Sequence, residues 1–304
     1  MIKYIAKKVG IAILTVFVLA TLTFFLVKLL PGDPFMNEKV PVKVQEAQRA
    51  YYGLDKPVAE QYFIYMNNLL HGNLGTSLKQ VGRNVGDIIA EAFPVSARLG
   101  LIAFVLSELI SILFGILCAQ FKDRLPDYIL MIVAILGVAL PSMVLGPLVR
   151  YLFGVKLKIL PATGWGSAKQ MILPIFVMTM SGIAGGTRSM RASMLSVTTQ
   201  DYIKTAKAKG LSPIKVVMRH ELKNSLVPII SNMGVNLASI MMGSFVVENI
   251  FLIPGLGKYF VDCVTTLDYP LVMGLTIFYG AFLVTANLII DVIYGLLDPR
   301  IRVK

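Results

Sequence analysis

The sequence predicts an all-α integral membrane protein with six transmembrane helices. Of its 304 residues, 56% are hydrophobic and only 15% are charged, and the mean hydropathy is +0.73. A typical soluble domain carries about 25% charged residues. The charged residues also cluster between long apolar stretches, whereas the helices of a soluble bundle would need polar faces. These observations exclude a soluble helical bundle.

Six apolar segments are close to the length of about 20 residues that crosses the hydrocarbon core of a membrane. The first follows Lys3, Lys7 and Lys8 but is too long for a signal-peptide core, so we predict that it is retained as a span. The fourth is short and rich in glycine, which spans tolerate where neighbouring helices approach closely. The six predicted spans are 9–30, 99–121, 129–153, 171–187, 226–247 and 271–296.

The distribution of Lys and Arg predicts the orientation of these spans. Basic residues accumulate on the cytoplasmic side of membrane proteins. They outnumber acidic residues in every second connection, whereas segment 31–98 is balanced and segment 154–170, with three lysines, is a local exception. The sequence therefore predicts that both chain ends lie in the cytoplasm, together with the basic segments 1–8, 122–128, 188–225 and 298–304.

Two of the predicted connections are too long to be simple turns. In the outer one, helices are expected over 42–52 and 57–70, because glycines follow both stretches. This outer segment is either a surface for an external partner or a structural cap on the bundle. The predicted parts are a tail and first span (1–30), a large extracytoplasmic segment (31–98) and a five-span core (99–304) with a cytoplasmic hairpin at about 196–225.

The inner connection predicts a compact pair of short helices. Asp201 begins a run of good helix formers with lysines at its end, which suits the helix dipole. Gly210 fits the C-terminal cap, and Ser212 and Pro213 fit the start of a second helix. Both flanks enter the membrane within a few residues, which argues against a DNA-reading motif. A docking element for a cytoplasmic partner and a solvated loop facing lipid phosphates remain as alternatives.

One side of the first short helix is expected to carry an apolar stripe. Tyr202, Ile203 and Ala206 share this side, next to the lysines 204, 207 and 209. The residues with which we expect the hairpin to contact its cytoplasmic partner are Asp201, Tyr202, Ile203, Lys204, Thr205, Ala206, Lys207, Ala208 and Gly210.

A few polar residues lie inside the predicted spans, where ionisable groups are costly. Glu108 is the most central of them, and it either lines a polar cavity or forms a contact between helices. The fifth span carries the same two alternatives at its polar positions, and its Met residues adapt to irregular surfaces. The candidate translocation-path residues are Glu108, Asn236, Ser239, Met242 and Ser244.

Several stretches, spread in order along the chain, resemble the permeases of the peptide/nickel family of type I ABC importers, and in particular their B-type subunit. The general permease signature, Glu-Ala-Ala, three residues and Gly, corresponds here to Lys204-Thr205-Ala206 and Gly210, so its Glu and first Ala are replaced. The stretches are Leu30-Pro-Gly-Asp-Pro34, Tyr52-Gly-Leu-Asp-Lys-Pro57, Gly72-Asn-Leu-Gly-Thr-Ser77, Asp201–Gly210, His220 with Asn224 and Pro228, Ile253-Pro-Gly-Leu-Gly257 and Asp291–Arg300.

The resemblance implies a type I ABC importer permease fold in the bacterial cytoplasmic membrane. It implies a second, C-type permease, two ATPase subunits that bind ATP and Mg, an extracytoplasmic binding protein and a peptide substrate. Membrane lipid surrounds the chain, and nucleic acid is not expected as a partner. The cargo would be an oligopeptide or a dipeptide, with nickel or another small solute as the alternative.

The sequence also argues against catalysis on this chain. It contains no phosphate-binding Gly-x-x-x-x-Gly-Lys-Ser/Thr motif, no nucleophile motif and only two histidines, His71 and His220. We therefore expect no cofactor or metal site. A secondary transporter is the alternative from another class, but it would favour matching broken helices in two halves of the chain, and no such repeat is present in the sequence.

Overall fold

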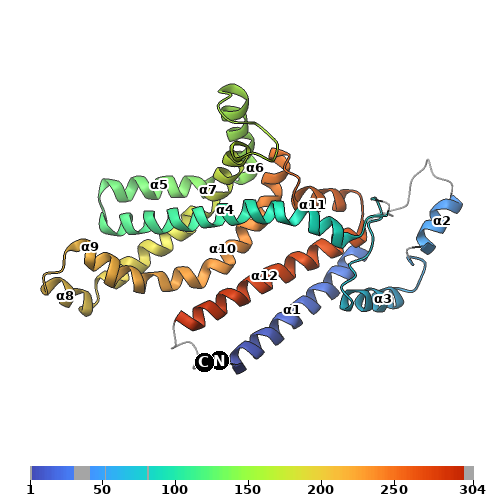
Figure 1. Cartoon of the computed structure of the whole chain (residues 1–304), viewed down its shortest axis with the longest axis horizontal. Helices are drawn as coiled ribbons and strands as arrows, with labels where there is room; N and C mark the ends of the chain where they lie inside the picture. The colour runs from blue at the N-terminus through green and yellow to red at the C-terminus, as the bar shows by residue number, and fades with distance from the viewer. Residues whose placement is uncertain (1, 31–41, 52, 81, 298–304) are drawn as a thin grey trace. The chain divides into compact units, whose positions relative to one another are not determined.

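The computed structural model describes residues 2–30, 42–51, 53–80 and 82–297, and Figure 1 shows its helices. The described residues contain no β-structure beyond one isolated bridge, Thr76–Asn84, so the all-α prediction is confirmed. The helices are α1 (Ile2–Lys28), α2 (Val42–Tyr51), α3 (Val58–Leu70), α4 (Val85–Gln120), α5 (Leu125–Ala139), α6 (Ser142–Val149), the π-helical η1 (Arg150–Lys156), α7 (Ala168–Thr198), α8 (Asp201–Ala208), α9 (Pro213–Val216), the π-helical η2 (Val217–Glu221), α10 (Leu222–Phe251), α11 (Leu256–Thr265) and α12 (Tyr269–Leu297).

Four helices are long and apolar enough to cross a membrane, and two bent helix pairs raise this number to six if each pair is one span. The predicted six spans fall within this range. The four helical spans are Ile5–Lys28, Val85–Gln120, Ala168–Thr198 and Tyr269–Ile290. The fourth predicted span, 171–187, therefore belongs to a longer helix than its short apolar core indicated.

The third predicted span, 129–153, is bent rather than straight. Helix α5 and the segment that follows it, Ser142–Lys156, meet at an angle of 101°. Leu140 is extended between them, with φ −100° and ψ 106°. The residue before a proline is driven out of the helical region by the proline ring, and Pro141 follows here.

A bend also follows α10 at its C-terminal end. Leu252 lies at this bend in the left-handed region, with φ 54°. The next amide, that of Ile253, donates a hydrogen bond of 2.8 Å to the carbonyl oxygen of Glu248. The predicted fifth span, 226–247, lies inside α10, and this turn marks where that helix ends.

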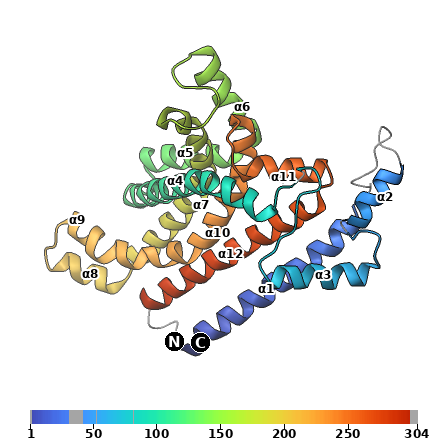
Figure 2. The same ribbon diagram turned by 45° about the vertical axis from the view of Figure 1, so that its right-hand side comes forward.

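The chain packs as two compact units, of which the first comprises Met1–Pro94 and Lys258–Leu288. Figures 1 and 2 both show α1 and α12 side by side within this unit. A Cβ added at Gly280 of α12 would lie 2.0 Å from Leu19 of α1, so the two helices approach closely there. Helices α2 and α3 match the two helices predicted for the outer segment.

The second unit comprises Val95–Gly257 and Ile289–Lys304, and α7 packs against α5 and α10 within it. Arg191 of α7 forms a two-pronged ion pair with Asp127 of α5, with N–O distances of 2.9 and 2.6 Å. Small residues let α7 approach α4, because a Cβ at Gly182 would lie 2.2 Å from Oγ of Ser107. This unit contains both candidate sites predicted from the sequence.

Candidate functional site

The connection between α7 and α10 forms the predicted helical hairpin, which lies at one end of these two helices in Figure 1. Helix α8 ends at Ala208, and Gly210 follows with φ +76°, a conformation that glycine adopts without strain. The amide of Gly210 donates to the carbonyl oxygen of Lys207 at 3.0 Å. Ser212 occupies the N-cap position of α9, as expected, but its side chain forms no capping hydrogen bond.

The two short helices share a small core of their own. Ile203 is fully buried, and Ala206 and Val216 are nearly so, with Val197 and Leu211 packed around them. The apolar stripe predicted for an external partner is therefore wrong for Ile203 and Ala206, because α9 covers them. Sequence reasoning missed this because it considered the face of the first helix without the second helix.

Most of the other predicted docking residues lie on the outside of the hairpin. Tyr202 is 43% exposed, and its hydroxyl accepts a hydrogen bond of 2.9 Å from the side-chain amide of Asn224. Lys204 pairs with Asp201 at 2.9 Å, and both side chains are exposed. The exposed predicted residues are Asp201, Tyr202, Lys204, Thr205, Lys207, Ala208 and Gly210.

Two exposed apolar residues of the hairpin were not predicted. Ile214 is 76% exposed and Met218 is 59% exposed. They are four residues apart on consecutive helical turns, the spacing that places side chains on one face. This spacing was visible in the sequence. Ile214 and Met218, together with Tyr202, give the hairpin an exposed apolar surface outside its internal core.

Glu108 of α4 forms a contact between helices, one of the two roles predicted for it. It is buried, and its Oε1 accepts a hydrogen bond of 2.8 Å from the side-chain amide of Asn236 of α10. Its second oxygen, Oε2, is buried and has no hydrogen-bond partner within the described part of the chain. An unpaired buried carboxylate oxygen is energetically costly, so this position is an unusual place for a purely structural group.

A cavity of about 200 Å³ lies between α7 and α10, and Asn236 lines it. The other lining residues include Ser189 and Asn232, so the cavity is polar on both helices. Ser244 lies elsewhere on α10 and is fully buried, with its hydroxyl donating to the carbonyl oxygen of Met241 at 2.6 Å. The side chains of Ser239 and Met242 lie outside the described residues. The structure thus brings Glu108 and Asn236 together.

The turn between α10 and α11 holds a second buried carboxyl group. Oε2 of Glu248 accepts a hydrogen bond of 2.7 Å from the amide of Gly257, while the hydroxyl of Ser96 accepts one of 2.8 Å from the amide of Leu256. A Cβ at Gly255 would lie 2.4 Å from Oε2 of Glu248, so the turn needs glycine for this close approach. The motif Ile253–Gly257 therefore forms a tightly packed corner.

In the part of the chain that the structure describes, no group of three or more His, Cys, Asp or Glu side chains is placed to hold a metal ion.

Two protein-family models match this chain. Residues 111–303 match the model described as "Binding-protein-dependent transport system inner membrane component", and residues 1–100 match the model of its N-terminal part. The chain belongs to this family of transport-system membrane components. The family resemblance inferred from the motifs is therefore confirmed, as is the location in the inner membrane.

Relatives of this transport-system component match along nearly its whole length. It is 42% identical to the dipeptide transport system permease protein of Bacillus subtilis, over 99% of this chain and 98% of the relative. It is 41% identical to the oligopeptide transport system permease protein of Haemophilus influenzae, over 99% of this chain and all of the relative. The hairpin, Glu108 and Glu248 lie within the matched length.

Proposed function

We propose that this chain is the permease subunit of an ATP-driven importer of peptides. The observation that carries the proposal is the full-length similarity, near 40% identity, to permeases named for dipeptide and oligopeptide transport. A second, C-type permease would complete the translocation path, and an extracytoplasmic binding protein would deliver the peptide to it. The outer segment 31–98 is the part of the chain proposed to face that protein.

In this proposal the chain is not itself an enzyme. Both family matches, 1–100 and 111–303, are to membrane components of transport systems. The sequence also has no phosphate-binding glycine motif. Two partner ATPase subunits would bind ATP and Mg, and this chain would supply no cofactor site.

The hairpin α8–α9 is proposed to transmit the movement of an ATPase subunit to the spans. Its own core makes it a rigid element, while Tyr202, Ile214 and Met218 provide an exposed apolar surface beside lysines. Ile203 and Ala206 would support this surface from behind. The proposal requires the hairpin and both chain ends to be cytoplasmic.

The translocation path is proposed to pass the polar face of α10. Glu108 and Asn236, with the cavity between α7 and α10, support this part of the proposal. Ser239, Met242 and Ser244 are the further candidates on the same helix.

Reconstitution of the four-subunit complex with its binding protein into liposomes tests the function. We expect uptake of labelled di- to pentapeptides that requires ATP inside the liposomes and the binding protein outside. A catalytically inactive ATPase variant is the control. Uptake of the same peptides by this chain alone, driven by an ion gradient, would identify a secondary transporter instead, and uptake of nickel without peptide would refute the assigned cargo.

The orientation is tested separately by single-cysteine labelling in intact cells. Lys207→Cys should resist a membrane-impermeant maleimide until the cells are opened, whereas Lys56→Cys in the outer segment should react at once. Labelling of Lys207→Cys in intact cells would contradict the coupling role of the hairpin.

A further inference from the structure

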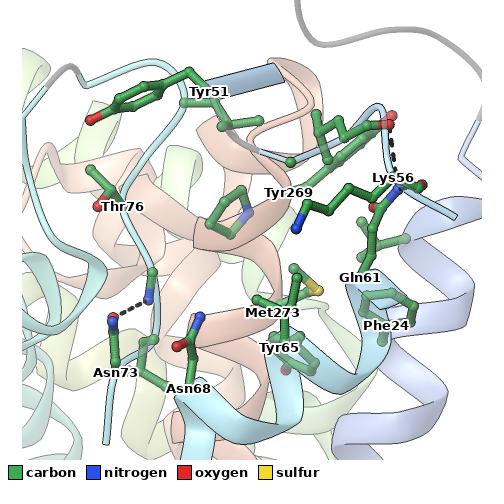
Figure 3. Close-up of a pocket in the computed structure, with 18 of the residues that line it drawn as sticks. Phe24, Tyr51, Lys56, Gln61, Tyr65, Asn68, Asn73, Thr76, Tyr269 and Met273 are labelled. Carbon is green, nitrogen blue, oxygen red and sulfur yellow. Dashed lines mark hydrogen bonds between the residues drawn. The ribbon is translucent and has the colours of Figure 1, made fainter. Parts of the chain in front are cut away.

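A cavity of about 620 Å³ lies inside the first unit, at the C-terminal end of α1. Helices α1, α3 and α12 contribute to its wall together with the loops near residues 53 and 75. Figure 3 shows the amides of Asn68 and Asn73 on one side of the cavity and the ring of Phe24 on the opposite side. Its described lining residues include two lysines and no acidic residue.

Lys28 is the lining cation to which the described part of the chain offers no counter-charge. It is in the last turn of α1, and its Nζ lies 5.7 Å from the ring centre of Phe24 and 5.9 Å from that of Tyr269. Its ammonium group donates a hydrogen bond to the side-chain oxygen of Gln61. Among the described residues no carboxylate pairs with Lys28, whereas the other lining lysine, Lys56, pairs with Glu60 at 2.8 Å.

Neutral hydrogen-bonding groups accompany this charge. The hydroxyl of Tyr65 is buried and lines the cavity, and it has no hydrogen-bond partner among the residues that the structure describes. Burial also raises the pKa of this hydroxyl, so it remains a donor at neutral pH. The amides of Asn68 and Asn73 add further polar groups to the wall. One unpaired cation, an unused hydroxyl donor and two amides are suited to an anion with several oxygen atoms.

The position of the cavity relates it to the membrane. Helix α1 is a candidate span that ends at Lys28, so the cavity lies where that span reaches the membrane boundary. The cavity-lining residues of α1 lie on the face opposite the exposed Leu22 and Leu26, so the exposed apolar face of this helix is not part of the cavity. Phospholipid headgroups are the anions found at such a boundary, and basic pockets between helices bind them.

We propose that this cavity binds the phosphate group of an anionic phospholipid, with Lys28 as the charged contact and Tyr65 as a hydrogen-bond donor. The place of the cavity at the end of a candidate span favours a lipid over free phosphate, because phospholipid headgroups are concentrated at that boundary. The proposal concerns the first unit alone and does not depend on the transported cargo.

Native mass spectrometry of the full-length chain in neutral detergent tests this proposal. Phosphatidylglycerol is titrated into the wild-type protein and into Lys28→Met, which keeps an unbranched side chain and removes the charge. We expect the variant to bind the lipid about five-fold more weakly, the effect of about 1 kcal/mol per basic residue near an anionic surface. Lys28→Arg should retain binding.

Lys43→Met is the matched control, because Lys43 is exposed on α2 of the same unit and does not line the cavity. It should bind phosphatidylglycerol as the wild type does. If Lys28→Met is not folded, Tyr65→Phe provides the second measurement, with binding about two- to ten-fold weaker for one lost hydrogen bond.

Three results would overturn the proposal. The first is equal binding of phosphatidylglycerol by the wild type, Lys28→Met and Tyr65→Phe. The second is an equal loss in Lys43→Met, which would indicate general surface charge. The third is displacement of the lipid by an equal concentration of inorganic phosphate, which would identify free phosphate as the ligand.

Discussion

Substitution of Gly210 isolates the contribution of one backbone angle to the hairpin. A Cβ added at Gly210 would have no heavy atom within 4 Å, so it would meet no steric obstacle. The only cost is the left-handed conformation, with φ +76°, which is about 1–2 kcal/mol for a residue with a Cβ. That free energy corresponds to about a 5- to 30-fold larger open population of the turn.

We expect a graded series, with Gly210→Asn mildest, Gly210→Ala intermediate and Gly210→Val most severe, because Asn tolerates the left-handed region and β-branched residues do not. Hydrogen exchange of the amides in 201–221 measures the opening in the isolated chain. Retention of the ATPase subunits on the tagged chain measures docking.

Gly86→Ala is the control, because Gly86 is helical, has no positive φ and also has no atom within 4 Å of the added Cβ. It should leave both measurements unchanged. Unaltered hydrogen exchange in Gly210→Val would refute the strain argument. Faster exchange with full ATPase retention would instead refute the docking role of the hairpin.

Three further substitutions test contacts in the second unit. Gly257→Ala should lower the stability by about 1–3 kcal/mol, because its Cβ would lie 2.6 Å from backbone atoms of Phe245; an unchanged melting temperature would contradict this packing. Arg191→Met should cost about 3–5 kcal/mol, since Asp127 is only 3% exposed and would lose its ion-pair partner; Asp127→Asn combined with Arg191→Met should recover part of that loss in thermal unfolding. Glu108→Gln should fold normally, whereas Glu108→Ala should lose about 0.5–1.5 kcal/mol because the half-buried amide of Asn236 loses this hydrogen bond; equal unfolding curves for the two variants would exclude that hydrogen bond.

The elements of the fold that depend on local sequence were predictable. Long apolar stretches indicated the helices, and Gly210 indicated the turn of the hairpin, because a periodic pattern and a positive φ are local properties. The bend before Pro141 was less apparent, since the apolar composition continues through it. Proline restricts the residue before it, but the sequence alone does not distinguish a mild kink from a turn of 101°.

The contacts of the candidate sites were predictable only in part. Glu108 was identified as an unusual residue because charge is costly inside a span. Its partner, Asn236, is 128 residues away, and no local pattern connects the two. The burial of Ile203 likewise depends on Val216 of the second short helix. The apolar stripe on the first helix therefore did not reveal whether it packs against the second helix or against a partner.

The glycine contacts between α4 and α7 limit which parts of the second unit can slide during a transport cycle. Cβ atoms at Gly182 and Gly186 would lie 2.2 and 2.4 Å from the hydroxyl oxygens of Ser107 and Ser111. On α4 itself, a Cβ at Gly115 would lie 2.4 Å from Met190. At three places in succession, one of these two helices therefore has space only for a glycine beside the other. We expect a rearrangement that opens a passage to move α4 and α7 together, because sliding would bring larger side chains into these close contacts.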